Sequence, residues 1–240
     1  MRLFKPNIPK LLVKKDVGGL VEALGDEDPQ IVWQAASALG DLRDPRAGDL
    51  LMEALGNPAS RLGAIRALGF TSNLRALEPL IAALKDSDAN VRHSAAFALP
   101  MLAHPFVVEP LAAALHDADH NVRWEAATGL GMMKDPRGID YLVEVLKDGN
   151  EGQRLEAAEA LGKFGGARAV EPLLAAIYDK WSLVSHAAAE ALGKIKDPGS
   201  IEPLRAAIKD PRQDVRMAAA NALEAITGEH HFVLGFPKSS

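Results

Sequence analysis

The sequence predicts an all-α fold, namely an α-solenoid of about seven two-helix repeats. The first observation is that a short sequence motif recurs at a fixed interval. The triplet Glu-Pro-Leu, or Asp-Tyr-Leu in one case, recurs every 31 residues, beginning at Glu78, Glu109, Asp140, Glu171 and Glu202. Self-similarity with a period of about 20 to 50 residues is typical of solenoids. The second observation is that apolar residues recur three and four apart within a repeat, which indicates helices, as in Val122, Ala126, Leu130 and Met133.

Each repeat is expected to hold two helices. Pro110 lies near the start of a first helix, where a missing N–H is tolerated. Residues 117–121 supply turn and N-cap side chains before the second helix. Repeat one pairs residues 16–24 with residues 29–42, and repeat two, residues 46–71, has a shortened inner turn. In repeats three to seven the pattern predicts first helices near residues 76, 107, 138, 169 and 200, and second helices beginning near residues 89, 120, 151, 182 and 213.

Composition and pattern divide the chain into three parts. Residues 1–15 have a charge of +5 and the remainder −10. We expect this basic segment to cap the first repeat, because terminal repeats need a cover; a weak contact with a membrane surface or an acidic partner is the alternative. Residues 16–227 form the repeat domain. Residues 228–240 form a C-terminal tail that either folds back over the last repeat or docks on a neighbouring molecule; its apolar residues are Phe232, Val233, Leu234 and Phe236.

Charge and composition narrow the classes of function. The formal net charge is −5, which disfavours nucleic-acid binding, because phosphate recognition needs a concentrated basic face. The chain has no cysteine, so disulfides, thiolate ligands and nucleophilic thiols are absent. No apolar run approaches the length of a membrane span, and the N-terminus lacks the apolar segment of a signal peptide. We therefore expect a cytoplasmic protein without a transmembrane segment.

Residues 119–137 carry a resemblance to a known family. Asp119-His120-Asn121-Val122-Arg123, then Ala126-Ala127, Leu130-Gly131 and Asp135-Pro136-Arg137, resemble the HEAT-like repeat of the phycobilisome (PBS) lyase type. The resemblance covers roughly residues 16–227. It implies a right-handed superhelix whose second helices line a concave wall. The family spans bilin lyases, an iron hydroxylase of a modified lysine and many adaptor scaffolds, so the function has to be argued from the site.

The candidate binding surface is the face of the second helices that points away from the core. Counting each second helix from its first core residue, position three lies opposite the core stripe. This position holds Trp33, Leu62, His93, Trp124, Leu155, His186 and Met217. Phe97 at position seven, and Glu125 and Glu156 at position four, lie beside the row. Contiguous exposed apolar surface marks interaction sites, so we expect one shared groove. The alternative is that curvature presses the second helices together and half-buries the row.

Position two holds arginine in five of the seven repeats. We expect ion pairs between repeats, from Arg61, Arg92, Arg123, Arg154 and Arg216 to turn aspartates such as Asp86, Asp117, Asp148 and Asp210. Binding of an external anion is the alternative.

The sequence does not predict an enzyme, although it leaves the question open. The deoxyhypusine hydroxylase branch of the resembled family carries His-Glu at positions three and four, and no repeat here has the complete pair. His93 and His186 precede Ser94 and Ala187, whereas Glu125 and Glu156 follow Trp124 and Leu155. A phosphate-binding loop and a nucleophile elbow are also missing. We therefore expect no catalytic residues, no metal ligands and no cofactor.

Our interpretation is a non-catalytic scaffold that binds a protein or peptide segment in the groove, with Trp124 at its centre. Glu125 and Glu156 predict that this segment carries apolar anchors and at least one basic residue. One alternative is a bilin lyase-like or chromophore-handling protein in which Trp124, His93 and Glu125 hold a flat tetrapyrrole. Two further alternatives are a deoxyhypusine hydroxylase-like metal oxygenase and a homodimer formed through the groove or the C-terminal tail.

Overall fold

The computed structural model describes residues 5–71 and 73–229, and the regular structure in these ranges is entirely helical. The chain groups into two compact units, residues 1–133 and residues 134–240. Unit 1 contains α1 (Ile8–Val13), α2 (Val17–Ala23), α3 (Pro29–Leu42), α4 (Pro45–Ala54), α5 (Arg61–Phe70), α6 (Leu77–Ala83), α7 (Ala89–Met101), α8 (Val108–Ala114) and α9 (His120–Met132), with 3-10 turns η1 (Leu74–Ala76) and η2 (Pro105–Val107). Unit 2 contains α10 (Pro136–Asp148), α11 (Glu151–Phe164), α12 (Gly166–Ala176), α13 (Ser182–Ile195), α14 (Ile201–Ala207) and α15 (Gln213–Thr227), with 3-10 turn η3 (Pro198–Ser200).

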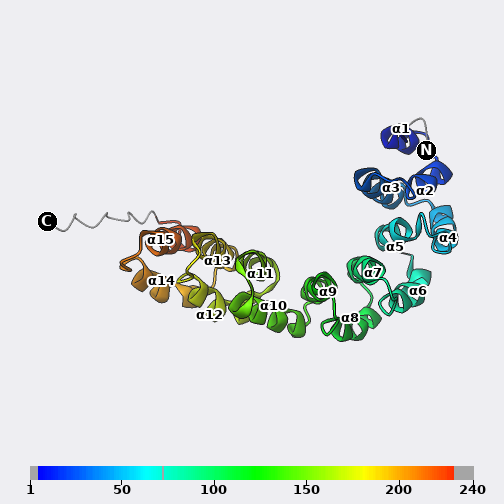
Figure 1. The fold of residues 1–240 in the computed structure, drawn as a ribbon. Helices are drawn as coiled ribbons and strands as arrows, with labels where there is room; N and C mark the ends of the chain where they lie inside the picture. Colours follow the sequence, from blue (N-terminus) through cyan, green and yellow to red (C-terminus); the bar gives the residue numbers. More distant parts are fainter. Residues whose placement is uncertain (1–4, 72, 230–240) are drawn as a thin grey trace. The chain divides into compact units, whose positions relative to one another are not determined.

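Each unit consists of two layers of helices, which confirms the α-solenoid. In unit 1 the first helices α2, α4, α6 and α8 lie on the outer side of a curved stack, and the second helices α3, α5, α7 and α9 lie on its concave side (Figure 1). In unit 2, α10, α12 and α14 form one layer and α11, α13 and α15 the other. Successive second helices pack against each other within each unit. Their outward faces therefore form a continuous surface within each unit.

The second helices of repeats three to seven begin at residues 89, 120, 151, 182 and 213, as the pattern predicts. Local side-chain caps contribute to these starts at α7, α9 and α11, whereas α13 and α15 have no side-chain cap. Asp28, Asp88 and Asp119 each accept a hydrogen bond from a backbone N–H in the first turn of the helix that follows. An N-cap of this kind satisfies a donor that the helix itself leaves unpaired. In repeat two the shortened turn leaves α5 without a side-chain cap.

The core is a column of leucine and alanine between the two layers. In α9 the side chains of Val122, Ala126 and Leu130 are fully buried. Leu111 of α8, on the facing layer, is fully buried as well. Alanine at the crossing points lets the helices approach closely, and leucine fills the space between them. The helical stripe in the sequence thus corresponds to the buried side of each second helix.

An arginine–aspartate ladder ties neighbouring repeats together. Arg61 Nη2 lies 2.6 Å from Asp86 Oδ2, and Arg92 Nε lies 2.8 Å from Asp117 Oδ2. In each case the arginine belongs to one repeat and the aspartate to the turn of the next. Arg154 forms the same kind of pair with the buried Asp179, in the turn of the next repeat. The predicted pairing between repeats is therefore confirmed for these three arginines.

Two other arginines of the row contact their own turn. Arg123 Nη1 donates to the carbonyl oxygens of Asp117 and Ala118, at 2.7 and 2.9 Å. Arg216 Nη1 donates to the carbonyl oxygens of Asp210 and Pro211, at 3.0 and 2.8 Å. The arginines of this row thus either form ion pairs between repeats or donate hydrogen bonds to the backbone of the preceding turn.

The N-terminal helix α1 packs against α2 and α3. Ile8 is buried, Leu11 and Leu12 are half-buried, and Lys5 Nζ lies 2.8 Å from Asp28 Oδ2. The predicted capping role of residues 1–15 stays a proposal, and these contacts support it. The apolar residues of the C-terminal tail lie outside the described part of the chain. No helix within residues 5–71 and 73–229 is long and apolar enough to cross a membrane.

Acid should destabilise the fold through the aspartates of its caps and ladder. The Arg46 guanidinium lowers the pKa of Asp44 to about 2, the Arg92 side chain lowers the pKa of Asp117, and the Arg137 side chain lowers the pKa of Asp135. A carboxyl whose pKa is lower in the folded state contributes stability that is complete above its unfolded pKa of about 4 and is lost as the pH falls further. We expect the free energy of unfolding, measured by urea titration, to fall steadily from pH 4 towards pH 2.

The variant Asp117→Asn should show a weaker dependence on pH in this range, because it has lost one of the titrating groups. A free energy of unfolding that stays constant between pH 5 and pH 2.5 would contradict the assignment.

Candidate functional site

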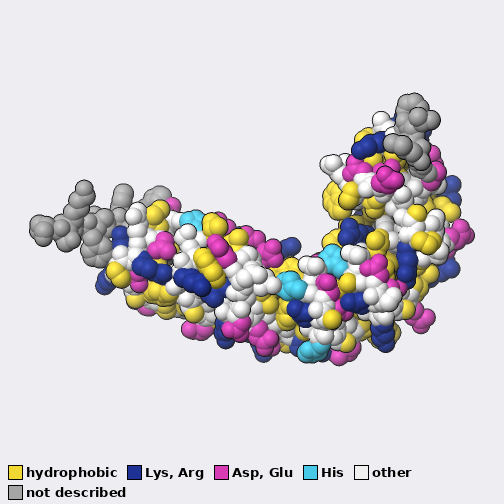
Figure 2. All heavy atoms as spheres, in the orientation of Figure 1, with side chains coloured by type: hydrophobic (Ala, Val, Ile, Leu, Met, Phe, Trp, Pro, Cys, Tyr) yellow, Lys and Arg dark blue, Asp and Glu magenta, His cyan; other side chains and the backbone are white. Residues whose placement is uncertain are grey.

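The candidate site is the face of the second helices that points away from the buried core. Because this face lies on the concave side of unit 1, it is called the inner face here, and the same name is used for the corresponding face of unit 2. In unit 1 its position-three residues are Trp33 on α3, Leu62 on α5, His93 on α7 and Trp124 on α9. Trp33 is 54% exposed and Leu62 is 38% exposed, whereas His93 and Trp124 are half-buried. In Figure 2 hydrophobic side chains appear among charged ones on both units, and histidines lie on the inner side over α7 and α9. The predicted row is therefore accessible at each of its four positions in unit 1.

In unit 2 the position-three residues lie on α11, α13 and α15. Leu155 is half-buried, while His186 and Met217 are exposed. Glu156 of α11 and Glu190 of α13 are also exposed on this face. Lys194 Nζ lies 3.8 Å from Glu190 Oε2, one helical turn along α13. The inner face of unit 2 is thus more acidic than that of unit 1.

The structure brings four polar side chains together on the inner face of unit 1. They come from three successive second helices: Arg66 from α5, His93 and Ser94 from α7, and Glu125 from α9. Arg66 Nε donates to Ser94 Oγ at 3.3 Å, and His93 Nε2 lies 3.8 Å from Glu125 Oε2. The Glu125 side chain is only 21% exposed. This polar cluster lies in the middle of the apolar row.

Burial shifts both titrating groups of the polar cluster towards their neutral forms. It raises the pKa of Glu125, and the positive charge of Arg66 opposes this shift only in part. Burial also lowers the pKa of His93, with Arg66 adding to the effect and Asp119 opposing it. A half-buried carboxylate without a full ion-pair partner gains when a cation approaches it. Glu125 is therefore a suitable acceptor for a basic side chain of a partner.

Phe97 does not stand free on the inner face. Its ring centroid lies 6.1 Å from that of Phe70, at an interplanar angle of 66°. Trp124 has a similar neighbour in His120, one turn earlier on α9, with ring centroids 6.4 Å apart. These contacts hold both aromatic rings in place and leave Phe97 and Trp124 partly exposed.

The histidines and acids of the site do not form a metal centre. His93 and Glu125 meet across a repeat boundary, but within the described ranges no group of three or more His, Asp or Glu side chains is gathered to hold an ion. A catalytic metal site usually takes three protein ligands. The polar cluster can orient a ligand and compensate its charge, and its geometry does not offer a metal-bound nucleophile.

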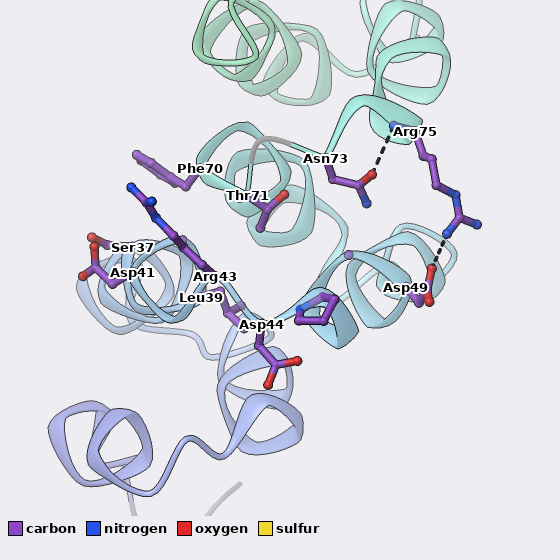
Figure 3. A pocket seen from close by; sticks show the side chains of 13 residues that line it. Ser37, Leu39, Asp41, Arg43, Asp44, Asp49, Phe70, Thr71, Asn73 and Arg75 are labelled. Carbon is purple, nitrogen blue, oxygen red and sulfur yellow. Dashed lines mark hydrogen bonds and ion pairs between the residues drawn. The ribbon is translucent and has the colours of Figure 1, made fainter.

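A further hollow of unit 1 lies where α3 ends and α4 begins. It has a volume of about 880 Å³, and Arg43, Asp44, Asp49, Asn73 and Arg75 line its polar part. Figure 3 shows two interactions in this lining: Asn73 Oδ1 accepts a hydrogen bond from the Arg75 backbone N–H, and Arg75 Nη1 lies 2.6 Å from Asp49 Oδ1. Asp44 is likewise engaged with Arg46. Three of the charged side chains that line this hollow, Asp44, Asp49 and Arg75, are therefore already paired.

A smaller pocket of about 280 Å³ opens on the inner face of unit 2, between α13 and α15. Its lining is formed by His186, Ala189, Glu190, Gly193, Lys194, Asn221 and Ala225. Leu183 and Met217, which are 58% and 46% exposed, lie on the same faces of α13 and α15. Spacing alone did not single out this pocket. Leu183 could have been found from the sequence, because the equivalent turn positions hold Asn90, Asn121 and Asp214.

The sequence matches the profile of one known family. The sequence profile of HEAT repeats matches residues 15–69, 56–119, 77–157, 108–192 and 182–230. No curated protein matches the chain in sequence.

Several solved structures are similar to this chain. The Escherichia coli protein YibA is 23% identical, with a TM-score of 0.54, over 90% of this chain and 85% of that chain. The complex of CpcE and CpcF of phycocyanin lyase from Nostoc sp. is 20% identical, with a TM-score of 0.52, over 90% of this chain and 85% of that chain. Human deoxyhypusine hydroxylase is 25% identical, with a TM-score of 0.44, over 92% of this chain and 89% of that chain. A shared fold of this kind leaves the function to be argued from the residues.

Proposed function

This chain belongs to the HEAT-repeat family, and from that premise we propose that it is a non-catalytic scaffold that binds a segment of another protein along its inner face. The observation that carries the proposal is the exposure of large apolar side chains opposite the core. Trp33 is 54% exposed and Leu62 is 38% exposed on adjacent helices of unit 1. Water does not stabilise such a row, and apolar surface of this kind usually marks an interaction site. The inner face therefore supports binding better than a role in packing alone.

The chemistry of the inner face specifies the class of partner. Tryptophan is enriched at the energetic centres of interfaces. We therefore expect apolar side chains of the partner to contact Trp33 and Trp124. Glu125 lies half-buried beside Trp124 and calls for a basic residue that would compensate its charge. Glu156 offers a second, exposed carboxylate on unit 2. We propose a helical or extended segment with apolar side chains and at least one Lys or Arg.

A chromophore-handling role is the second candidate. Trp124, His93 and Glu125 place an aromatic ring, an imidazole and a carboxylate on neighbouring turns of α7 and α9, and these groups could face a flat tetrapyrrole. The fold shared with a phycocyanin lyase complex is compatible with this role without arguing for it. Membership in the PBS lyase branch belongs to this second candidate.

One capture experiment separates the two candidates. The tagged wild-type chain and the variants Leu62→Glu and Leu74→Glu are used as baits in extracts of the native host. Both leucines are exposed, but Leu62 lies on the inner face and Leu74 in η1, so the two variants differ in place and not in chemistry. We expect a partner protein that wild type and Leu74→Glu retain in equal amounts and Leu62→Glu loses. Mass spectrometry identifies the captured protein.

An absorbance scan of the same eluates decides between protein and pigment. A visible absorption band that follows the Leu62→Glu loss, without a stoichiometric protein, would favour the chromophore role. Equal retention by all three baits would remove the support for an inner-face binding site.

A further inference from the structure

The pocket between α13 and α15 lies close to the point where the last helix ends. Asn221 and Ala225 line it from the last two turns of α15, and α15 ends at Thr227. The next residue, Gly228, has φ = +75°, a left-handed conformation that glycine adopts without strain and that turns the chain out of the helix axis. The polypeptide therefore leaves α15 beside the pocket.

The sequence that follows has the composition of a ligand for this pocket. Residues 230–240 lie outside the described part of the chain, and they read His-His-Phe-Val-Leu-Gly-Phe-Pro-Lys-Ser-Ser. They hold four large apolar residues, one lysine and no acid. Phe232 is four residues beyond Gly228, and an extended chain of that length reaches about 13 Å. Phe232 is therefore within reach of a pocket whose lining includes Ala225.

We propose that the segment Phe232–Phe236 docks in the pocket between α13 and α15 of its own chain. Apolar contacts would come from Ala189 and Ala225 in the pocket, and from Leu183 and Met217 beside it. Removing such exposed apolar surface from water stabilises the docked state. The segment has the chemistry that the inner face of unit 2 selects, so it occupies a place that an external partner would otherwise take.

Charge favours the same occupant. Exposed carboxylates on the inner face of unit 2 include those of Glu156, Glu159 and Glu190, and Glu190 is paired with Lys194, which also lines the pocket. Lys238 would bring a positive charge to this acidic face without adding a negative one. An acidic tail would be repelled from the same surface.

The chain has no native cysteine, so a pair of introduced cysteines can form a disulfide only with each other or with another copy of the chain. The full chain carries either the pair Asn221→Cys and Phe232→Cys or the control pair Ala206→Cys and Phe232→Cys. Asn221 and Ala206 are both exposed, but Asn221 lines the pocket and Ala206 lies on the first helix α14. Under mild oxidation we expect the pocket pair to close within one chain at least about tenfold faster than the control, because docking raises the local concentration of the tail. Mass spectrometry and non-reducing gels measure the rates at several protein concentrations.

Two further readouts make the result decisive. Adding Leu234→Asp and Phe236→Asp to the pocket pair keeps the tether but removes the apolar anchors, so the rate should fall to that of the control. Equal rates for the two cysteine pairs would overturn the proposal. Disulfide-linked dimers that dominate and grow with protein concentration would also overturn it, and would place the segment on a second copy of the chain. The experiment needs no external partner, so its outcome is independent of the capture by the inner face of unit 1.

Discussion

Replacing Leu130 by alanine should lower the free energy of unfolding by about 2 to 5 kcal/mol, as large-to-small changes in a packed core do. Leu130 is fully buried in α9, between the layers of unit 1. The surrounding helices cannot close the space that the lost methyl groups leave, so both transfer energy and packing are lost. Urea unfolding followed by circular dichroism measures the change.

Met132→Ala is the matched control, because Met132 lies on the same helix and is 50% exposed. It should change the free energy of unfolding by no more than about 0.5 kcal/mol. If Leu130→Ala unfolds at the same urea concentration as the wild-type chain, the assignment of the buried side of α9 is wrong.

Replacing Trp124 by alanine should weaken binding of the captured partner segment by about 2 kcal/mol or more, which is about thirtyfold in the dissociation constant. Trp124 is half-buried on the inner face and precedes Glu125, the carboxylate of the polar cluster, on α9. Its ring offers the partner a large apolar surface at little conformational cost. Isothermal titration with a synthetic peptide of the captured segment gives the dissociation constant, and thermal unfolding checks the fold.

Phe106→Ala provides the matched aromatic control. Phe106 is 74% exposed but lies in η2, outside the inner face, so its removal should leave the affinity unchanged. If Trp124→Ala instead unfolds the protein and leaves the affinity of the folded fraction unchanged, Trp124 serves packing and the scaffold proposal loses its central residue.

The elements of this fold could be read from the sequence because their causes are local. An aspartate such as Asp88 or Asp119 caps the N–H groups of its own helix, and an apolar stripe decides which side of that helix is buried. Both effects act over one or two turns, and repetition at a fixed interval carries them along the chain. The starts of α7 and α9 could be predicted for this reason, whereas those of α13 and α15, which have no side-chain cap, followed from the repeat interval.

The candidate site could be predicted only in part. The sequence pattern indicated which residues point away from the core, and none of the position-three residues is buried in the structure. It did not indicate how far neighbouring helices cover them. His93, Trp124 and Leu155 are half-buried, while Trp33, Leu62, His186 and Met217 remain exposed. The exposed fraction of a position-three side chain depends on the size of the side chains that neighbouring repeats place beside it. The residues of one repeat alone do not give this information.

The sequence by itself determined the helix pairs, the aspartate caps of helices such as α7 and α9, the buried stripe and the arginine row, because each follows from residues close together in the chain. The tertiary structure decided the division into two compact units and the meeting of His93 with Glu125. It also decided that a pocket opens between α13 and α15, next to the end of the last helix. These features depend on the distances between residues about 25 or more positions apart, and those distances are set by how side chains of successive repeats pack, which local spacing does not specify.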